Sequence, residues 1–272
     1  MELTTRAGKS VAPLGLAGRP GLEGGCVDAA FAAGLDYFFF YSGDCAAMLD
    51  GLAALCRDCR DEVFIATGSE SRDPQRLRAY RDETLRRLGA AALDIFYLEY
   101  VAPHDDIDAL LAPDGALNEL ERWQDDGLIR YIGVTTHNRL LSLELIASGR
   151  IEVLMHRYNM AHRGAEAAVL PAAQAAAIPV VAFTCTRWGS LLRGHRNWDG
   201  AVPRAAACYR YALRHPAVRL ALTAPETTGE LRENRAVLAT AATADAGQWA
   251  EWEEYGRLVY GDGTDSFETQ YP

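Results

Sequence analysis

Two carboxylates and one histidine stand at or just after the ends of short apolar segments, where they could transfer protons to or from a substrate. Glu99 and Asp44 could form an acid/base pair, because burial or close approach of two carboxyls raises the pKa of one of them. Glu99 could instead be neutralised by a nearby arginine, and Asp44 could cap a helix. His137 could act as a general base or could simply stand at a helix start. The candidate catalytic residues are therefore Glu99, Asp44 and His137.

Arginines and aromatic residues at similar positions could bind a small polar or anionic substrate. Arg157 is predicted by the alternation of strand side chains to point inward, where it would bind a carboxylate of a ligand or of Glu99. Arg187 and Trp188 lie in a long loop that could be a lid over a ligand or a plain connection. The candidate substrate-binding residues are Tyr41, Tyr100, Arg157, Asn159, Arg187 and Trp188.

The elements that must position these residues follow from eight apolar runs, which alternate with segments of helical length. The runs are continuously apolar, as in parallel strands that are buried on both faces. Strands are predicted at 11–16, 37–41, 63–67, 95–100, 129–134, 153–157, 179–183 and 218–223. Eight strand–helix units in 272 residues predict an α/β fold, a (β/α)8 TIM barrel, that forms one domain over residues 1–272.

Two extensions should flank this barrel. Residues 3–13 are predicted to form a hairpin that turns at Gly8 and Lys9, and the chain should end with a helix and a tail. The tail, 261–272, could fold over the mouth of the barrel or fray. A doubly wound sheet is the alternative fold, but its usual glycine fingerprint is missing. In a barrel the active site lies at the carboxyl ends of the strands, which is where the candidate residues stand.

Composition argues against several classes of function. The 37 acidic residues outnumber the 27 basic ones, and a net charge of −10 disfavours nucleic acid as a partner. No apolar run approaches the roughly 18 residues of a membrane span, and the first residues are polar, so a cytoplasmic protein is expected. Cys56 and Cys59 lie in a predicted helix without a second cysteine pair at metal-binding spacing, so no metal site is expected.

Several short segments, in their order and separation, resemble the aldo-keto reductases over nearly the whole chain. The matching positions are 132–137, 158–159, 166, 170–171, 182–184, 216–218 and 231–234. The resemblance implies a barrel enzyme that transfers a hydride between a nicotinamide cofactor, NAD or NADP, and a small carbonyl or alcohol substrate.

The catalytic residues that the resemblance implies are not present at the aligned positions. Such reductases use an aspartate, a tyrosine that donates the proton, a lysine that lowers the pKa of the tyrosine, and a histidine. The aligned positions hold Phe39, Asp44, Gly68 and Glu99. Lys9 is the only lysine of the chain and lies near its start, so no shift of the alignment restores the tetrad. A reductase rebuilt on this chain needs a different donor, such as Glu99 or Asp44 protonated at neutral pH.

The cofactor-binding residues that the resemblance implies are kept in part. Phe183 matches the aromatic residue that stacks on nicotinamide, whereas Met155 replaces the glutamine that holds the nicotinamide amide. Glu230 stands where an arginine often binds the 2′-phosphate, and a carboxylate there favours NADH. The candidate cofactor-binding residues are Thr135, Thr136, Phe183, Thr184, Glu230, Glu233 and Asn234.

Three functions are compatible with these residues. The first, favoured by the resemblance, is a divergent nicotinamide-dependent oxidoreductase with an unusual proton donor. The second is a non-redox isomerase or lyase that uses Glu99 and Asp44 on an anionic substrate held by Arg157 or Arg187. The third is a non-catalytic binding or regulatory subunit with a protein partner.

Overall fold

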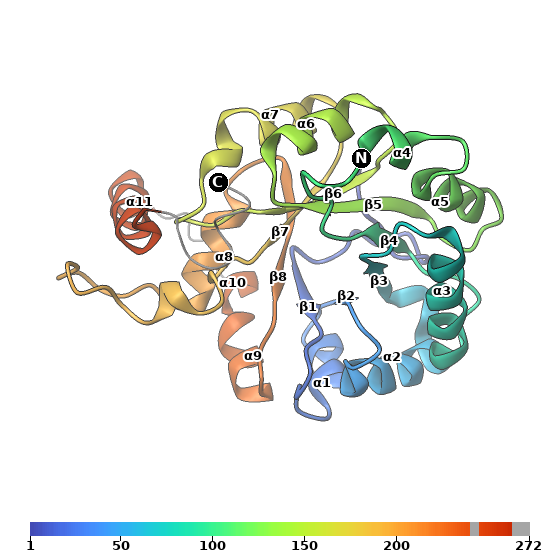
Figure 1. The fold of residues 1–272 in the computed structure, drawn as a ribbon. Helices are drawn as coiled ribbons and strands as arrows, with labels where there is room; N and C mark the ends of the chain where they lie inside the picture. Colours follow the sequence, from blue (N-terminus) through green and yellow to red (C-terminus); the bar gives the residue numbers. More distant parts are fainter. Residues whose placement is uncertain (240–244, 263–272) are drawn as a thin grey trace.

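The computed structural model describes residues 1–239 and 245–262, which contain a closed barrel of eight parallel strands in sequential order (Figure 1). The predicted (β/α)8 TIM barrel is therefore confirmed, and all eight predicted strands are present. The strands are β1 (Leu14–Ala17), β2 (Tyr37–Phe40), β3 (Phe64–Ser69), β4 (Ile95–Leu98), β5 (Tyr131–Thr136), β6 (Val153–Arg157), β7 (Val180–Phe183) and β8 (Val218–Thr223).

Helices connect the strands and surround the barrel, and the final helix α11 lies at the edge of the molecule, as Figure 1 shows in red. The described helices are α1 (Cys26–Ala32), α2 (Ala46–Cys59), α3 (Pro74–Leu88), α4 (Ile107–Leu111), α5 (Ala116–Asp125), α6 (Arg139–Ala147), α7 (Val169–Ala175), α8 (Ala205–Leu213), α9 (Thr228–Asn234), α10 (Ala236–Ala239) and α11 (Ala246–Tyr260). The described 3-10 turns are η1 (Arg60–Glu62), η2 (Gly164–Ala167) and η3 (Ser190–Leu192). Within residues 1–239 and 245–262, every helix is too short or too polar to cross a membrane.

The bounds of α3 show how local sequence sets a helix. The carboxylate of Asp73 accepts a hydrogen bond from the backbone N–H of Gln75 at 2.8 Å, and Pro74 occupies the first helical position. Gly89 ends the helix with a φ of 63°, a left-handed conformation that glycine adopts without strain. Both boundaries agree with the prediction from the sequence.

The barrel interior is filled by side chains that alternate along each strand. Tyr37 stacks on Phe64 with ring centroids 5.1 Å apart, and its hydroxyl lies 2.9 Å from the hydroxyl of Tyr97. Leu3 and Val11 of the N-terminal segment belong to the same buried cluster. Because this packing fills the lower barrel, ligands can enter only at the carboxyl ends of the strands.

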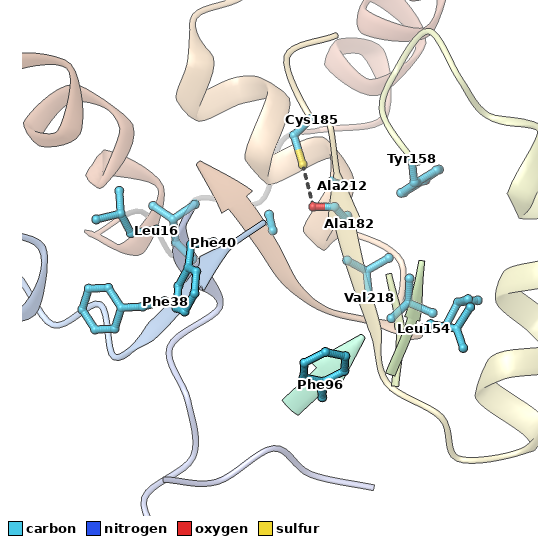
Figure 2. Packing of buried hydrophobic residues seen from close by; sticks show 14 of the residues in the cluster. Leu16, Phe38, Phe40, Phe96, Leu154, Tyr158, Ala182, Cys185, Ala212 and Val218 are labelled. Atoms are coloured by element: carbon cyan, nitrogen blue, oxygen red, sulfur yellow. Dashed lines mark hydrogen bonds between the residues drawn. The ribbon is translucent and has the colours of Figure 1, made fainter. Parts of the chain in front are cut away.

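A second apolar layer lies between the strands and the helices. Figure 2 shows part of it, with Leu16, Phe38 and Phe40 on one side of the view and Leu154 and Val218 on another. These positions alternate with the inward-facing ones, so each strand is buried on both faces. This explains why the strands appear in the sequence as unbroken apolar runs.

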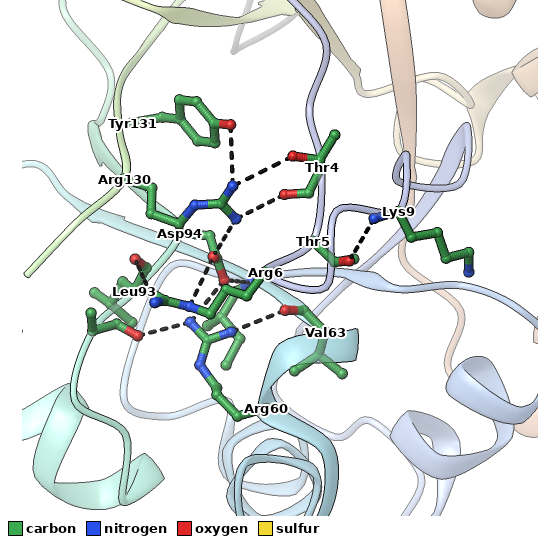
Figure 3. Close-up of polar contacts among 12 residues, drawn as sticks. Thr4, Thr5, Arg6, Lys9, Arg60, Val63, Leu93, Asp94, Arg130 and Tyr131 are labelled. Atoms are coloured by element: carbon green, nitrogen blue, oxygen red, sulfur yellow. Dashed lines mark hydrogen bonds and ion pairs between the residues drawn. The ribbon is translucent and has the colours of Figure 1, made fainter. Parts of the chain in front are cut away.

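The N-terminal segment closes the bottom of the barrel through a buried carboxylate (Figure 3). Thr4 and Ser10 form an antiparallel bridge, which confirms the predicted hairpin in outline. Asp94 forms ion pairs with Arg60 at 2.8 Å and Arg130 at 3.0 Å, and Arg130 also donates a hydrogen bond to the carbonyl of Thr4. The segment is thus fixed to the strands by charge as well as by apolar contacts.

The C-terminal extension agrees with the prediction in its helix. The predicted tail, 261–272, lies outside the described residues except for positions 261 and 262. Two predicted helices are each divided in the structure: 165–177 becomes η2 and α7, and 227–239 becomes α9 and α10. None of these differences alters the barrel that positions the candidate residues.

Candidate active site

A cavity of about 1650 Å³, here called the large cavity, lies at the carboxyl ends of the strands, where the sequence predicts the site. It brings together residues from all three candidate sets. The candidates that line it are Glu99, Tyr41, Tyr100, Trp188, Thr135, Phe183, Thr184, Glu230, Glu233 and Asn234.

Glu99 follows β4 directly and is 4% exposed. Among the described residues, its Oε1 atom has no hydrogen-bond partner. The carboxyl group fits because Gly68 on the neighbouring strand has no side chain: a Cβ atom there would lie 2.6 Å from Oε1. The Glu99 carboxyl therefore occupies the space that a larger residue at position 68 would fill.

Burial raises the pKa of Glu99 to about 8, and the negative charge of Glu70 raises it further, whereas Arg72 lowers it. Arg72 does not form an ion pair with this carboxyl. Its guanidinium pairs with Asp105 at 2.9 Å and donates a hydrogen bond to the backbone carbonyl of Glu99. In the described part of the chain no arginine forms an ion pair with Glu99, so the alternative of a neutralised carboxylate is not supported. At neutral pH the group is a carboxylic acid that can donate a proton.

The floor of the large cavity is formed by residues of β5, β6 and β7. Phe183 is half-buried at the end of β7, and Met155 of β6 lies in the same lining. The hydroxyl of Thr135 accepts a hydrogen bond from the backbone N–H of Tyr100 at 2.7 Å, which ties the end of β5 to the turn after β4. An aromatic ring beside hydroxyl groups can hold a planar polar ring system.

The far end of the large cavity carries three carboxylates, those of Glu226, Glu230 and Glu233. The side chain of Glu230 accepts a hydrogen bond from the backbone N–H of Glu226 at 2.7 Å. Arg19 forms an ion pair with Glu226 at 2.9 Å, so this end is only partly compensated. The buried Asn234 donates a hydrogen bond to Thr223.

Asp44 lies outside this cavity. Its side chain is exposed and accepts a hydrogen bond from the Ser42 hydroxyl at 3.2 Å. The N-cap residue of α2 is Cys45, so the predicted capping role of Asp44 is wrong. The predicted pair with Glu99 is likewise not formed, because the chain turns away from the barrel after β2.

Three further candidates hold the backbone and do not line the large cavity. The hydroxyl of Thr136 donates to the carbonyl of Val101 at 2.6 Å. The side chain of Asn159 donates to the carbonyl of Thr184 and accepts from two backbone N–H groups of its own loop. Arg187 is buried and donates to the carbonyl of Val259. Their contacts are structural.

His137 and Arg157 line a different hollow of about 460 Å³, here called the second cavity, beside the carboxyl ends of β5 and β6. The imidazole of His137 packs against Tyr100 and Phe183, with ring centroids 5.4 and 5.1 Å away. Burial lowers the pKa of His137 to about 3, and Arg157 lowers it further. The predicted inward arginine therefore does not face Glu99.

Sequence reasoning missed several residues of the large cavity. Phe39, Glu70, Arg72 and Asp105 line it, together with arginines of the loop before α8. Arg72 stands three positions after β3, so the criterion of proximity to a strand end could have found it. Its partner Asp105 is 33 residues away in sequence, and no local signal joins the two.

Comparisons with known proteins agree with the fold. A family model described as the aldo/keto reductase family matches residues 39–202. A D-threo-aldose 1-dehydrogenase from a Pseudomonas species is 26% identical over 212 residues, which cover 68% of this chain and 63% of that protein. The chain thus matches less than two thirds of the length of this curated relative.

Solved structures show the same barrel at lower sequence identity. An aldo-keto reductase from Klebsiella pneumoniae in complex with NADPH superposes with a TM-score of 0.75 at 18% identity, over 100% of this chain and 99% of that one. The holo form of an aldo-keto reductase from Bacillus halodurans superposes with a TM-score of 0.74 at 16% identity, over 95% of each chain. At these identities the likeness shows the fold.

Proposed function

The chain belongs to the aldo/keto reductase family, and from this premise we propose that it is a nicotinamide-dependent oxidoreductase of a small carbonyl or alcohol substrate, with Glu99 as its proton donor. The observation that supports this proposal is the carboxyl of Glu99 itself. It is buried at the large cavity, its Oε1 atom has no hydrogen-bond partner among the described residues, and its raised pKa keeps it protonated at neutral pH.

The lining of the large cavity fits a nicotinamide dinucleotide. Phe183 offers a half-buried ring for the nicotinamide, with Thr135 and Thr184 beside it, and Glu233 and Asn234 lie at the adenosine end. The volume of about 1650 Å³ has room for a dinucleotide and a small substrate together. When bound, the cofactor supplies or accepts the hydride.

Glu99 supplies the proton that reduction of a carbonyl requires. A neutral carboxyl does not repel the negative charge that develops on the substrate oxygen, and it can donate its proton to that oxygen. A pKa of about 8 is close to the operating pH, where a group serves well both as acid and as base. In the oxidation direction the ionised Glu99 accepts the proton of the alcohol.

We propose that Glu99 takes over the role of the family's tyrosine and lysine. Phe39 lines the cavity but carries no proton to donate, and Gly68 has no side chain. Lys9, the only lysine, is paired with Asp36 at 2.9 Å at the bottom of the barrel, far along the strands from the large cavity. The absence of a side chain at position 68 is also what makes room for the Glu99 carboxyl.

The preferred cofactor in this proposal is NADH. Glu226, Glu230 and Glu233 gather at the end of the cavity where the adenosine would lie, and their charges repel a 2′-phosphate. A carboxylate can instead accept hydrogen bonds from a free ribose hydroxyl. The alternative of an isomerase or lyase loses support, because Asp44, its second acid, lies outside the cavity.

Fluorescence titration with NADH and NADPH, followed by assays on a panel of small aldehydes and ketones, tests the proposal. NADH should bind more tightly than NADPH. Glu99→Gln should bind NADH normally and lose about 100-fold or more of the turnover, because it keeps the shape and removes the acid. Glu70→Gln, an acid of the same cavity, is the control and should retain most of the activity.

The proposal fails if neither nucleotide binds at millimolar concentration, or if Glu99→Gln turns over as fast as the natural protein. Tighter binding of NADPH than of NADH would contradict only the cofactor preference.

A further inference from the structure

The second cavity is cationic although the chain as a whole is acidic. Its charged lining consists of four arginines and two glutamates: Arg139, Arg157, Arg163, Arg257, Glu253 and Glu254. This excess of arginine is the opposite of the overall balance, in which 37 acidic residues outnumber 27 basic ones. The volume of about 460 Å³ falls in the range of about 300–1000 Å³ that small-molecule sites occupy.

Ion pairs within the lining compensate only part of this charge. Arg163 pairs with Glu253 at 3.1 Å and with Glu166 at 3.2 Å, so its charge is balanced inside the protein. By contrast, within residues 1–239 and 245–262 no ion pair involves Arg139 or Arg257. Both of these arginines are exposed at the rim, one at the start of α6 and the other on α11. They present two guanidinium groups to a ligand from opposite sides of the cavity.

Three histidines add hydrogen-bond donors to the lining without adding charge. Burial lowers the pKa of His137 to about 3, of His156 to about 4 and of His162 to about 2, and the charge of Arg157 contributes in each case. A neutral imidazole carries one N–H donor. In the part of the chain that the structure describes, no three histidine, cysteine or acidic side chains are grouped so as to hold a metal ion.

We propose that the second cavity binds a compact dianion, a phosphate ester or a dicarboxylate, through Arg139, Arg157 and Arg257. The planar guanidinium group binds both kinds of oxyanion with two parallel hydrogen bonds. The ligand would lie one side chain away from the large cavity, because His137 lines the second cavity and contacts Phe183. The site does not depend on the proposed oxidoreductase activity.

Calorimetric titration of the full chain with inorganic phosphate and, separately, with succinate tests this proposal at constant ionic strength set with KCl. At least one of the two should bind, and the tighter one identifies the kind of dianion. The double variant Arg139→Gln/Arg257→Gln should bind it at least about tenfold more weakly, because two charge-assisted contacts are lost. Both side chains are exposed, so the variant should fold.

Arg193→Gln is the matched control, because Arg193 is an exposed arginine that lines the large cavity. It should leave the affinity unchanged. The proposal is overturned if neither phosphate nor succinate binds at 10-millimolar order, if the double variant binds as tightly as the natural protein, or if Arg193→Gln weakens binding more than the double variant does.

Discussion

Two carboxylates flank the same strand, and their surroundings differ completely. Asp94 precedes β4 at the bottom of the barrel, and Glu99 follows β4 at the mouth; both are buried. Asp94 lies within 3.4 Å of the guanidinium groups of Arg6, Arg60 and Arg130. Glu99 forms no ion pair in the described part of the chain, and its Oε1 atom has no hydrogen-bond partner there.

The difference shows two ways to bury a carboxyl group. At the bottom, three arginines compensate the charge of Asp94, and the network fixes the N-terminal segment to the strands (Figure 3). At the mouth, Glu99 keeps its proton instead, because burial raises its pKa to about 8. The first arrangement stabilises the fold, whereas the second leaves a proton at a cavity where a substrate can reach it.

Replacing the two carboxyl groups one at a time should separate these roles. Asp94→Asn leaves the three arginines without their counter-charge and should lower the free energy of unfolding by about 3–5 kcal/mol. Glu99→Gln removes a group that is already neutral and should change it by less than about 1 kcal/mol. Urea denaturation at pH 7 measures both. Equal losses in the two variants would contradict the distinction.

The pH dependence of stability should show the raised pKa of Glu99. Between about pH 4.5 and 8 the folded protein holds a proton on Glu99 that the unfolded chain releases, so this contribution is complete below pH 4.5 and is lost as the pH rises to about 8. The loss is about 1.4 kcal/mol for each unit of pKa shift. The buried histidines act in the opposite sense below about pH 6.5, because their pKa values are lowered.

The difference between the natural protein and Glu99→Gln, measured by denaturation from pH 4.5 to 9, isolates Glu99 from the histidines. A difference that stays constant over this range would show that the pKa of Glu99 is not raised.

Gly68→Ala should disturb the mouth and leave the bottom intact. The added Cβ atom would lie 2.6 Å from Oε1 of Glu99 and 2.5 Å from the carbonyl oxygen of Tyr97, so one of them must move. We expect a destabilisation of about 1–3 kcal/mol and a fall in turnover. Gly24→Ala is the control, since nothing lies within 4 Å of a Cβ atom there. Full turnover in Gly68→Ala would show that the position of the Glu99 carboxyl does not matter.

The barrel could be predicted from the sequence because strands buried on both faces produce unbroken apolar runs. Helix boundaries such as Asp73-Pro74 and Gly89 follow from local chemistry and agree with the structure. The short helix α4 and the divisions at η2 and α9 were not predicted, because they depend on contacts between distant segments.

The site was predictable where a residue stands directly at a strand end. Glu99 and Phe183 do, and both line the large cavity. Asp44 lies four residues beyond β2, where the chain has already turned outward. Strand alternation places Arg157 at the mouth, but it cannot show that α11, about 90 residues later, creates a second cavity around that side chain. Such divisions depend on packing, which no single segment encodes.

The ionisation state of Glu99 tests the central claim most directly. Carbon NMR of the glutamate side-chain carboxyls, with Glu99→Gln identifying the signal, follows its titration in the natural protein. The account predicts a carboxyl that is protonated at pH 7 and titrates near pH 8. A Glu99 carboxyl that is fully ionised at pH 7, with an ordinary glutamate pKa, would contradict it.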